Sequence, residues 1–73
     1  SGQGRALRLL GFVYQTLGDL YRKLGEYDKA LEHHQQDLQI ARELQDKAGQ
    51  GRALGNMGDV YNWIGEYDKA WEH

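Results

Sequence analysis

The chain has 73 residues, a formal net charge of -2 at neutral pH and no cysteine. A chain of this length forms one domain at most, and its hydrophobic core is marginal without further support. The lack of cysteine excludes disulfides and thiolate metal ligands. Basic and acidic residues are interspersed, so we expect no single-sign surface for nucleic acid or for an anionic membrane. No apolar stretch is long enough to cross a bilayer, and we expect one soluble domain over residues 1–73.

The first predicted helix runs from about Gln3 to Leu24. Apolar residues recur in it at steps of three and four, which indicates an amphipathic helix whose apolar stripe faces the core. Gly25 stands where a helix-ending glycine belongs. The residues of the predicted stripe are Ala6, Leu10, Val13, Leu17, Leu20 and Leu24.

The second predicted helix starts near Glu26 or Tyr27 and ends around Gln45. Asp46 follows, and its carboxylate can accept the free amides at the start of a third helix. The residues that we expect the second helix to bury are Ala30, Leu31, Leu38, Ala41 and Leu44.

The third predicted helix runs from about Lys47 to Ile64 and is ended by Gly65. A fourth helix of two turns then takes Tyr67 to His73. No segment alternates with the period of a strand. The prediction is an all-α fold of antiparallel helical hairpins with four helices, of which the first is extended and the last is short.

Two short segments of the sequence occur twice. GQGRAL stands at residues 2–7 and 49–54, and GEYDKA stands at residues 25–30 and 65–70. The offset is 47 residues for the first segment and 40 for the second, so the first copy carries seven additional residues. The chain therefore holds less than two repeat units, with repeat segments at 17–45 and 57–73.

The segment LGDLYRKLGEYDKALEHHQQDLQIARE resembles a tetratricopeptide repeat. The resemblance implies pairs of helices that cross at small residues, so that a neighbouring backbone approaches Gly18 and Gly58 closely. The period of about 40 residues and the linker DKAGQGRAL look like the longer repeats of the Pins type of spindle-orientation adaptors. The family's Gly, Tyr, Gly, Tyr and Ala positions are matched twice, by Gly18, Tyr21, Gly25, Tyr27 and Ala30 and by Gly58, Tyr61, Gly65, Tyr67 and Ala70.

The resemblance also implies a peptide groove beside the first helix of each repeat. Where many peptide-binding members carry Asn on the groove side, this sequence has Asp19 and Asp59. Their charge disfavours an acidic C-terminal peptide, so the expected ligand is a neutral or basic peptide. Arg52 and Asn56 are the residues that we expect to hold its backbone.

The seven additional residues lengthen the first helix by about two turns, or roughly 10 Å, with little rotation of its face. They add apolar surface, and we take Leu9, Phe12 and Trp63 as candidate interface residues. Two alternatives stay open, because either the short fourth helix or a second copy of the chain in a homodimer can cover this surface. Trp71 replaces an apolar Leu of the first copy, and we expect it in the core.

Catalytic and metal-binding signals are weak. His33 and His34 are adjacent and point about 100° apart on a helix, so they cannot share one metal ion. His33 can reach Asp37 one turn later, but we expect these side chains to be solvated. Apart from the tyrosines, the hydroxyl residues are Ser1 and Thr16, so no nucleophile, base and acid gather. We expect no enzyme activity, no cofactor and no metal.

Two function classes remain favoured over a His-dependent metal or catalytic protein. The near-identical repeated segments, the two-turn extension and a first residue other than Met favour an engineered, non-enzymatic helical scaffold. Such a scaffold has no native ligand and associates with itself. The alternative is a peptide-binding fragment of a natural tetratricopeptide-repeat adaptor.

Overall fold

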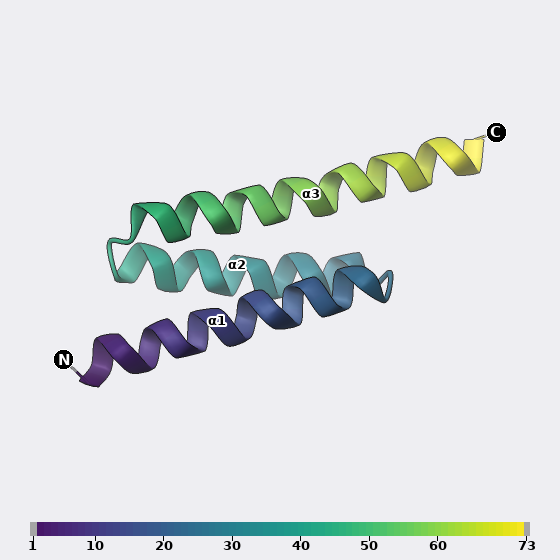
Figure 1. Cartoon of the computed structure of the whole chain (residues 1–73). Helices are drawn as coiled ribbons and strands as arrows, with labels where there is room; N and C mark the ends of the chain where they lie inside the picture. Colours follow the sequence, from purple (N-terminus) through teal and green to yellow (C-terminus); the bar gives the residue numbers. More distant parts are fainter. Residues whose placement is uncertain (1, 73) are drawn as a thin grey trace.

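The computed structural model describes the backbone of residues 2–72 and the side chains of residues 4–66. Within this range three helices follow one another, α1 (Gly2–Lys23), α2 (Tyr27–Glu43) and α3 (Lys47–Glu72). They form two successive antiparallel hairpins, with α2 lying between α1 and α3 (Figure 1). The predicted all-α fold is confirmed, whereas the predicted number of four helices is wrong. None of the described helices is both long enough and apolar enough to cross a membrane.

The turn after α1 forms where it is predicted. Gly25 has a φ of +79°, and its amide donates to the carbonyl of Arg22 at 3.0 Å while the amide of Glu26 donates to the carbonyl of Tyr21 at 2.9 Å. This pair of hydrogen bonds closes a helix around one left-handed residue, a conformation that glycine adopts without strain. An equivalent pair of bonds closes α2, but the left-handed residue there is Gln45, with a φ of +55°.

The start of α3 is capped as predicted. The amide of Gly49 donates to Oδ1 of Asp46 at 3.0 Å. A helix begins with amides that have no partner inside the helix, and an Asp at this position satisfies one of them.

Gly65 does not end a helix, in contrast to the prediction. α3 continues through it to Glu72, so the segment from Tyr67 forms no separate helix. GEYDKA therefore starts with a turn at Gly25 and stays helical at Gly65. The turn at Gly25 leads into a helix of 17 residues that packs along α1. The expected core position of Trp71 lies outside the described side chains.

The core is small and lies on both faces of α2. Three of the five residues expected to be buried on α2 are buried, while Leu31 and Leu44 are half-buried. Ile40 is buried without having been expected. The buried apolar residues are Ala30, Leu38, Ile40, Ala41, Ala53 and Val60.

The apolar stripe predicted for the first helix does not face the core. Gly11 and Gly18 lie on the buried side of α1 instead. Because glycine has no Cβ, α2 approaches α1 closely on this side. The leucines on the opposite side of α1 therefore lie outside the core. Leu17 of the stripe is half-buried and Ala6 is exposed. The exposed fractions of Leu10, Val13, Leu20 and Leu24 are 44%, 48%, 49% and 63%.

Candidate functional site

Two polar side chains of α2 are buried. His34 is 0% exposed and Asp37 is 2% exposed. They share one face of α2 with the buried Ala30 and Ala41, because the four residues follow at steps of three and four. The expectation that Asp37 is solvated is therefore wrong. In the sequence, the burial of His34 and Asp37 is indicated by their helical spacing between Ala30 and Ala41. A search for stripes of apolar residues alone overlooks this pattern.

Glycines of α1 make room for this polar pair. A Cβ on Gly18 would lie 2.6 Å from Cε1 and from Nε2 of His34, and a Cβ on Gly11 would lie 3.1 Å from Oδ1 of Asp37. Gly18 thus permits the close approach that was expected, but the approaching group is an imidazole ring rather than backbone. Gly58 is exposed and a Cβ there would meet nothing within 4 Å, so the same expectation is wrong for Gly58.

Each residue of the buried pair lies near an oppositely charged side chain of a neighbouring helix, but too far from it for a hydrogen bond. Nε2 of His34 lies 3.6 Å from Oδ1 of Asp19 on α1, and Oδ1 of Asp37 lies 3.8 Å from Nη2 of Arg52 on α3. Both ring nitrogens of His34 and Oδ2 of Asp37 have no hydrogen-bond partner. No group of three or more potential metal ligands forms among the described residues.

Burial shifts the pKa of His34 and the pKa of Asp37 in the directions that favour the neutral form of each side chain. Loss of hydration lowers the pKa of His34, and the nearby carboxylates of Asp19 and Asp37 oppose this shift. Loss of hydration raises the pKa of Asp37, and the guanidinium of Arg52 opposes this shift. The interface between the helices therefore holds a polar pair whose charged forms are costly.

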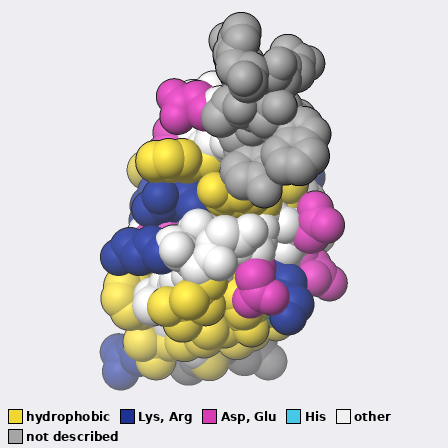
Figure 2. Space-filling model, turned by 90° about the vertical axis from the view of Figure 1, so that its right-hand side faces the viewer, with side chains coloured by type: hydrophobic (Ala, Val, Ile, Leu, Met, Phe, Trp, Pro, Cys, Tyr) yellow, Lys and Arg dark blue, Asp and Glu magenta, His cyan; other side chains and the backbone are white. Residues whose placement is uncertain are grey.

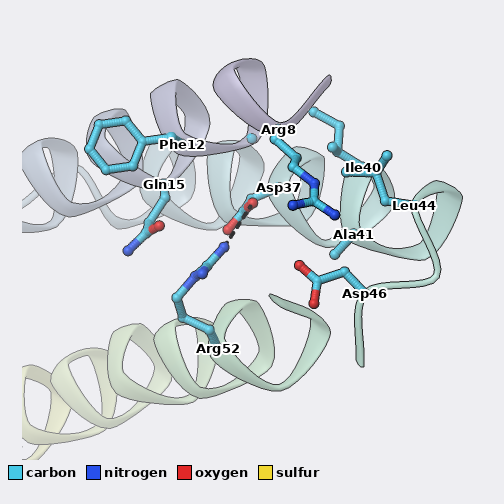
Figure 3. A pocket seen from close by; sticks show the side chains of 10 residues that line it. Arg8, Phe12, Gln15, Asp37, Ile40, Ala41, Leu44, Asp46 and Arg52 are labelled. Carbon is cyan, nitrogen blue, oxygen red and sulfur yellow. Dashed lines mark ion pairs between the residues drawn. The ribbon is translucent and has the colours of Figure 1, made fainter. Parts of the chain in front are cut away.

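A pocket of about 230 Å³ opens beside Asp37 between the three helices. In Figure 3, Arg52 reaches from α3 towards Asp37 on α2, and Arg8 extends from α1 on the other side of the pocket. Both charge signs are thus present in the pocket, together with apolar side chains of α2. Its lining includes Arg8, Phe12 and Gln15 of α1, Asp37 and Ile40 of α2, and Arg52 of α3.

A second pocket, of about 350 Å³, lies further along the same two outer helices. Arg22 lines it from α1, and Trp63 is the aromatic residue that lines it from α3. The remaining lining residues are Asp59, Asn62 and Glu66 of α3.

The two pockets belong to one strip between α1 and α3, which we call the α1–α3 groove. The helical period places its residues on one side of each helix. From Arg8 to Arg22 the groove is about 21 Å long at 1.5 Å per residue, which matches roughly six residues of an extended peptide. The residues of α1 and α3 that line it include Arg8, Gln15 and Arg22 of α1 and Arg52, Asp59, Trp63 and Glu66 of α3.

Two of the four predicted groove residues line these pockets. Arg52 lines the first pocket and Asp59 lines the second. Asp19 is half-buried beside His34. Asn56 is half-buried one turn after Arg52, and its Nδ2 has no hydrogen-bond partner.

The three predicted interface residues are all exposed. Leu9 and Phe12 are each 64% exposed and Trp63 is 47% exposed. Phe12 lines the first pocket and Trp63 lines the second. Within the described part of the chain no fourth helix covers them, which removes that alternative for Leu9 and Phe12.

Comparison with known proteins agrees with this helical arrangement. The model of the family described as tetratricopeptide repeat matches residues 2–73. The chain belongs to the tetratricopeptide-repeat family. Repeats of this family are in general non-catalytic modules of protein–protein interaction, and no catalytic family is indicated. No solved structure matches the chain significantly.

Curated relatives within the family are much longer proteins. Human G-protein-signaling modulator 1 is 41% identical over 51 residues, which are 70% of this chain and 8% of the relative. Human tetratricopeptide repeat protein 28 is 49% identical over 52 residues, which are 71% of this chain and 2% of the relative. These relatives are natural proteins, so the comparisons favour a natural tetratricopeptide-repeat protein over an engineered scaffold.

Proposed function

We propose that the chain is part of a natural tetratricopeptide-repeat protein and that its α1–α3 groove binds an extended segment of a partner protein. The observation that carries this proposal is the presence of two pockets between the same two helices, both with polar and charged linings. α1 and α3 leave a strip open between them, floored in the first pocket by Asp37 and Ile40 of α2. Such a strip offers both hydrogen-bonding groups and apolar contacts to a peptide.

The chemistry of the groove favours a neutral or basic peptide. In the second pocket the carboxylates of Asp59 and Glu66 lie near the exposed ring of Trp63, a combination that suits a Lys or Arg side chain. In the first pocket the guanidinium of Arg52 can donate hydrogen bonds to peptide carbonyls.

Fluorescence polarisation with labelled peptides of about eight residues tests the proposal. Basic, neutral and acidic series of equal length are compared, and we expect affinities on the order of micromolar for the first two. Asp59→Asn should raise the dissociation constant of the basic peptides about tenfold, which corresponds to roughly 1.4 kcal/mol. Arg52→Ala should raise the dissociation constant of every series that binds. Glu43→Gln is the matched control, because Glu43 is exposed on α2 and lines neither pocket. Absence of binding in every series, or tightest binding of the acidic series, contradicts the proposal.

Self-association is a second candidate function. It is supported by the large apolar side chains that α1 exposes, since contiguous apolar patches on a surface commonly mark an interface. The measurement is the molecular mass as a function of concentration. This function is independent of peptide binding, because it uses the side of α1 that faces away from α2.

A further inference from the structure

The carboxylate of Asp37 is a buried polar group that lines the first pocket of the α1–α3 groove. Asp37 is 2% exposed, and its Oδ2 has no hydrogen-bond partner. Nη2 of Arg52 lies 3.8 Å from Oδ1, which is too far for a hydrogen bond. A buried carboxylate in this state is costly, because it has lost its hydration without gaining a donor. A hydrogen-bond donor that enters the pocket would supply the missing partner.

The formal charges of the residues that line this pocket cancel. Arg8 and Arg52 contribute two positive charges, and Asp37 and Asp46 contribute two negative charges. A charged ligand would be attracted by two of these residues and repelled by the other two, and it would also lose its hydration. The pocket therefore favours an uncharged group over a carboxylate or an ammonium.

An uncharged group that suits this pocket has to donate one hydrogen bond and accept another. The acceptor in the pocket is the carboxylate of Asp37 and the donor is the guanidinium of Arg52, which point towards each other in Figure 3. A primary carboxamide carries an NH₂ group and a carbonyl oxygen side by side. One carboxamide can therefore bond to both residues, which are too far apart to bond to each other.

The apolar part of the pocket suits the methylene groups of a longer side chain. Phe12 lines it from α1 with 64% of its surface exposed, and Ile40 and Ala41 line it from α2. Its volume of about 230 Å³ lies below the range of about 300–1,000 Å³ that is typical for drug-sized ligands, so it holds one side chain. Because Asp37 belongs to the middle helix, a peptide that lies along α1 and α3 reaches it with a side chain rather than with its backbone.

We propose that the first pocket selects a glutamine of the bound peptide, whose carboxamide donates to Asp37 and accepts from Arg52. The proposal rests on peptide binding in the α1–α3 groove and assigns one side chain of the peptide to the first pocket. The methylene groups of the glutamine lie against Phe12 and Ile40.

The second pocket sets the position of a basic residue relative to this glutamine. Figure 2 views the molecule from the end of the groove that holds the second pocket, and acidic, hydrophobic and basic side chains lie next to one another below the grey residues. Arg52 of the first pocket and Asn62 of the second are ten residues apart on α3, or about 15 Å. Four residues of an extended peptide span about 13 Å and return the side chain to the same face. The expected ligand therefore carries Gln and Lys four positions apart.

Fluorescence polarisation with labelled peptides of eight residues tests the proposal. Each peptide carries Lys four positions from a test residue, and both orders are measured because the two pockets do not set the direction of the peptide. In the order that binds more tightly, Met in place of Gln keeps a similar stem without the carboxamide and should raise the dissociation constant about tenfold. Glu or Lys in place of Gln should raise it about tenfold or more, because either charge is repelled by two lining residues.

Asp37→Asn is the matched change in the protein, because it replaces the carboxylate by a carboxamide of similar shape. The variant leaves the pocket with one more positive than negative charge, so the Glu peptide should now bind at least as tightly as the Gln peptide. Glu43→Gln removes a carboxylate at an exposed position outside both pockets and should keep the wild-type preference for Gln. Circular dichroism checks that each variant is helical, and the wild-type preference among the four peptides is decisive even if Asp37→Asn fails to fold.

The outcomes separate the glutamine pocket from peptide binding itself. Equal affinities of the Gln and Met peptides overturn the glutamine pocket and leave the groove as a peptide site. Tightest binding of the Glu or Lys peptide also overturns it, because the pocket then prefers a charge. A preference for Gln that Asp37→Asn leaves unchanged overturns the assignment to Asp37. Absence of binding by every peptide up to about millimolar concentration overturns peptide binding in the groove and the glutamine pocket with it.

Discussion

The imidazole ring of His34 lies directly against the backbone of Gly18. A Cβ on residue 18 would come within 2.6 Å of the ring. The ring is 0% exposed and cannot move aside into solvent. This contact therefore sets how closely α1 and α2 approach, and it explains why a glycine is needed in the middle of α1 despite its low helix propensity.

Gly18→Ala is expected to lower the free energy of unfolding by about 1–3 kcal/mol, because the methyl group overlaps the His34 ring. Gly58→Ala is the matched control. Gly58 is also helical, but a Cβ there meets nothing within 4 Å. Gly58→Ala should therefore raise the free energy of unfolding by up to about 1 kcal/mol through helix propensity. Urea unfolding followed by circular dichroism gives both values, and a stabilising effect of both substitutions would contradict the packing described for Gly18.

Acidification is expected to destabilise the fold through His34. Burial lowers the pKa of His34 below its ordinary value of 6.5. As the pH falls below 6.5, the unfolded chain takes up the proton first, so the free energy of unfolding decreases until the lower pKa of the folded chain is reached. His34→Phe keeps a planar ring that does not titrate. In this variant the free energy of unfolding should decrease less on acidification. His33→Gln is the control for loss of an imidazole, and urea unfolding between about pH 5 and pH 8 is the measurement.

Asp37 contributes a pH dependence of opposite sign. Burial raises its pKa above the ordinary value of 3.8, so the folded chain holds this proton more firmly than the unfolded chain does. The stability that protonation contributes is lost as the pH rises through the raised pKa. Adding Asp37→Asn to His34→Phe removes this second dependence, and a slope that persists in the double variant would show that other groups dominate.

Gln45→Gly is expected to stabilise the chain. Gln45 holds a φ of +55° at the end of α2, a conformation that costs a residue with a side chain about 1–2 kcal/mol relative to glycine. The gain is reduced because glycine is more flexible in the unfolded chain, so we expect a net increase of about 0.5–1 kcal/mol. Thermal and urea unfolding measure it, with Glu43→Gly inside the last turn of α2 as a control that should destabilise.

Gly65→Ala distinguishes a continuous α3 from a turn at residue 65. In a continuous helix alanine is favoured, and a Cβ at Gly65 meets nothing within 4 Å, so the substitution should raise the stability by up to about 1 kcal/mol. Gly25→Ala should instead lower the stability by about 1–2 kcal/mol, because residue 25 has a φ of +79°. Loss of stability in Gly65→Ala would show that the chain turns at residue 65 as it does at residue 25.

Several elements follow from the sequence alone. The spacing of apolar residues indicates helices, the glycine at residue 25 marks the turn after α1, and Asp46 marks the start of α3. The repeated Gly and Tyr positions identify the tetratricopeptide repeat. Helical periodicity and caps depend mainly on interactions between residues that are close in the sequence. The turn signal is weaker, because the same GEYDKA segment turns at Gly25 and stays helical at Gly65.

Other features are decided by the tertiary structure. The sequence pattern places Leu10 and Leu20 in the core, but the structure buries Gly11 and Gly18 instead. A leucine row and a glycine row are both consistent with one amphipathic helix, and the choice depends on which row fits the facing surface of α2. That surface carries the ring of His34, for which only the glycine row leaves room. The same physical reason brings Arg52 of α3 beside Asp37 of α2, because the crossing of helices far apart in the sequence is set by the shape of their contacting faces.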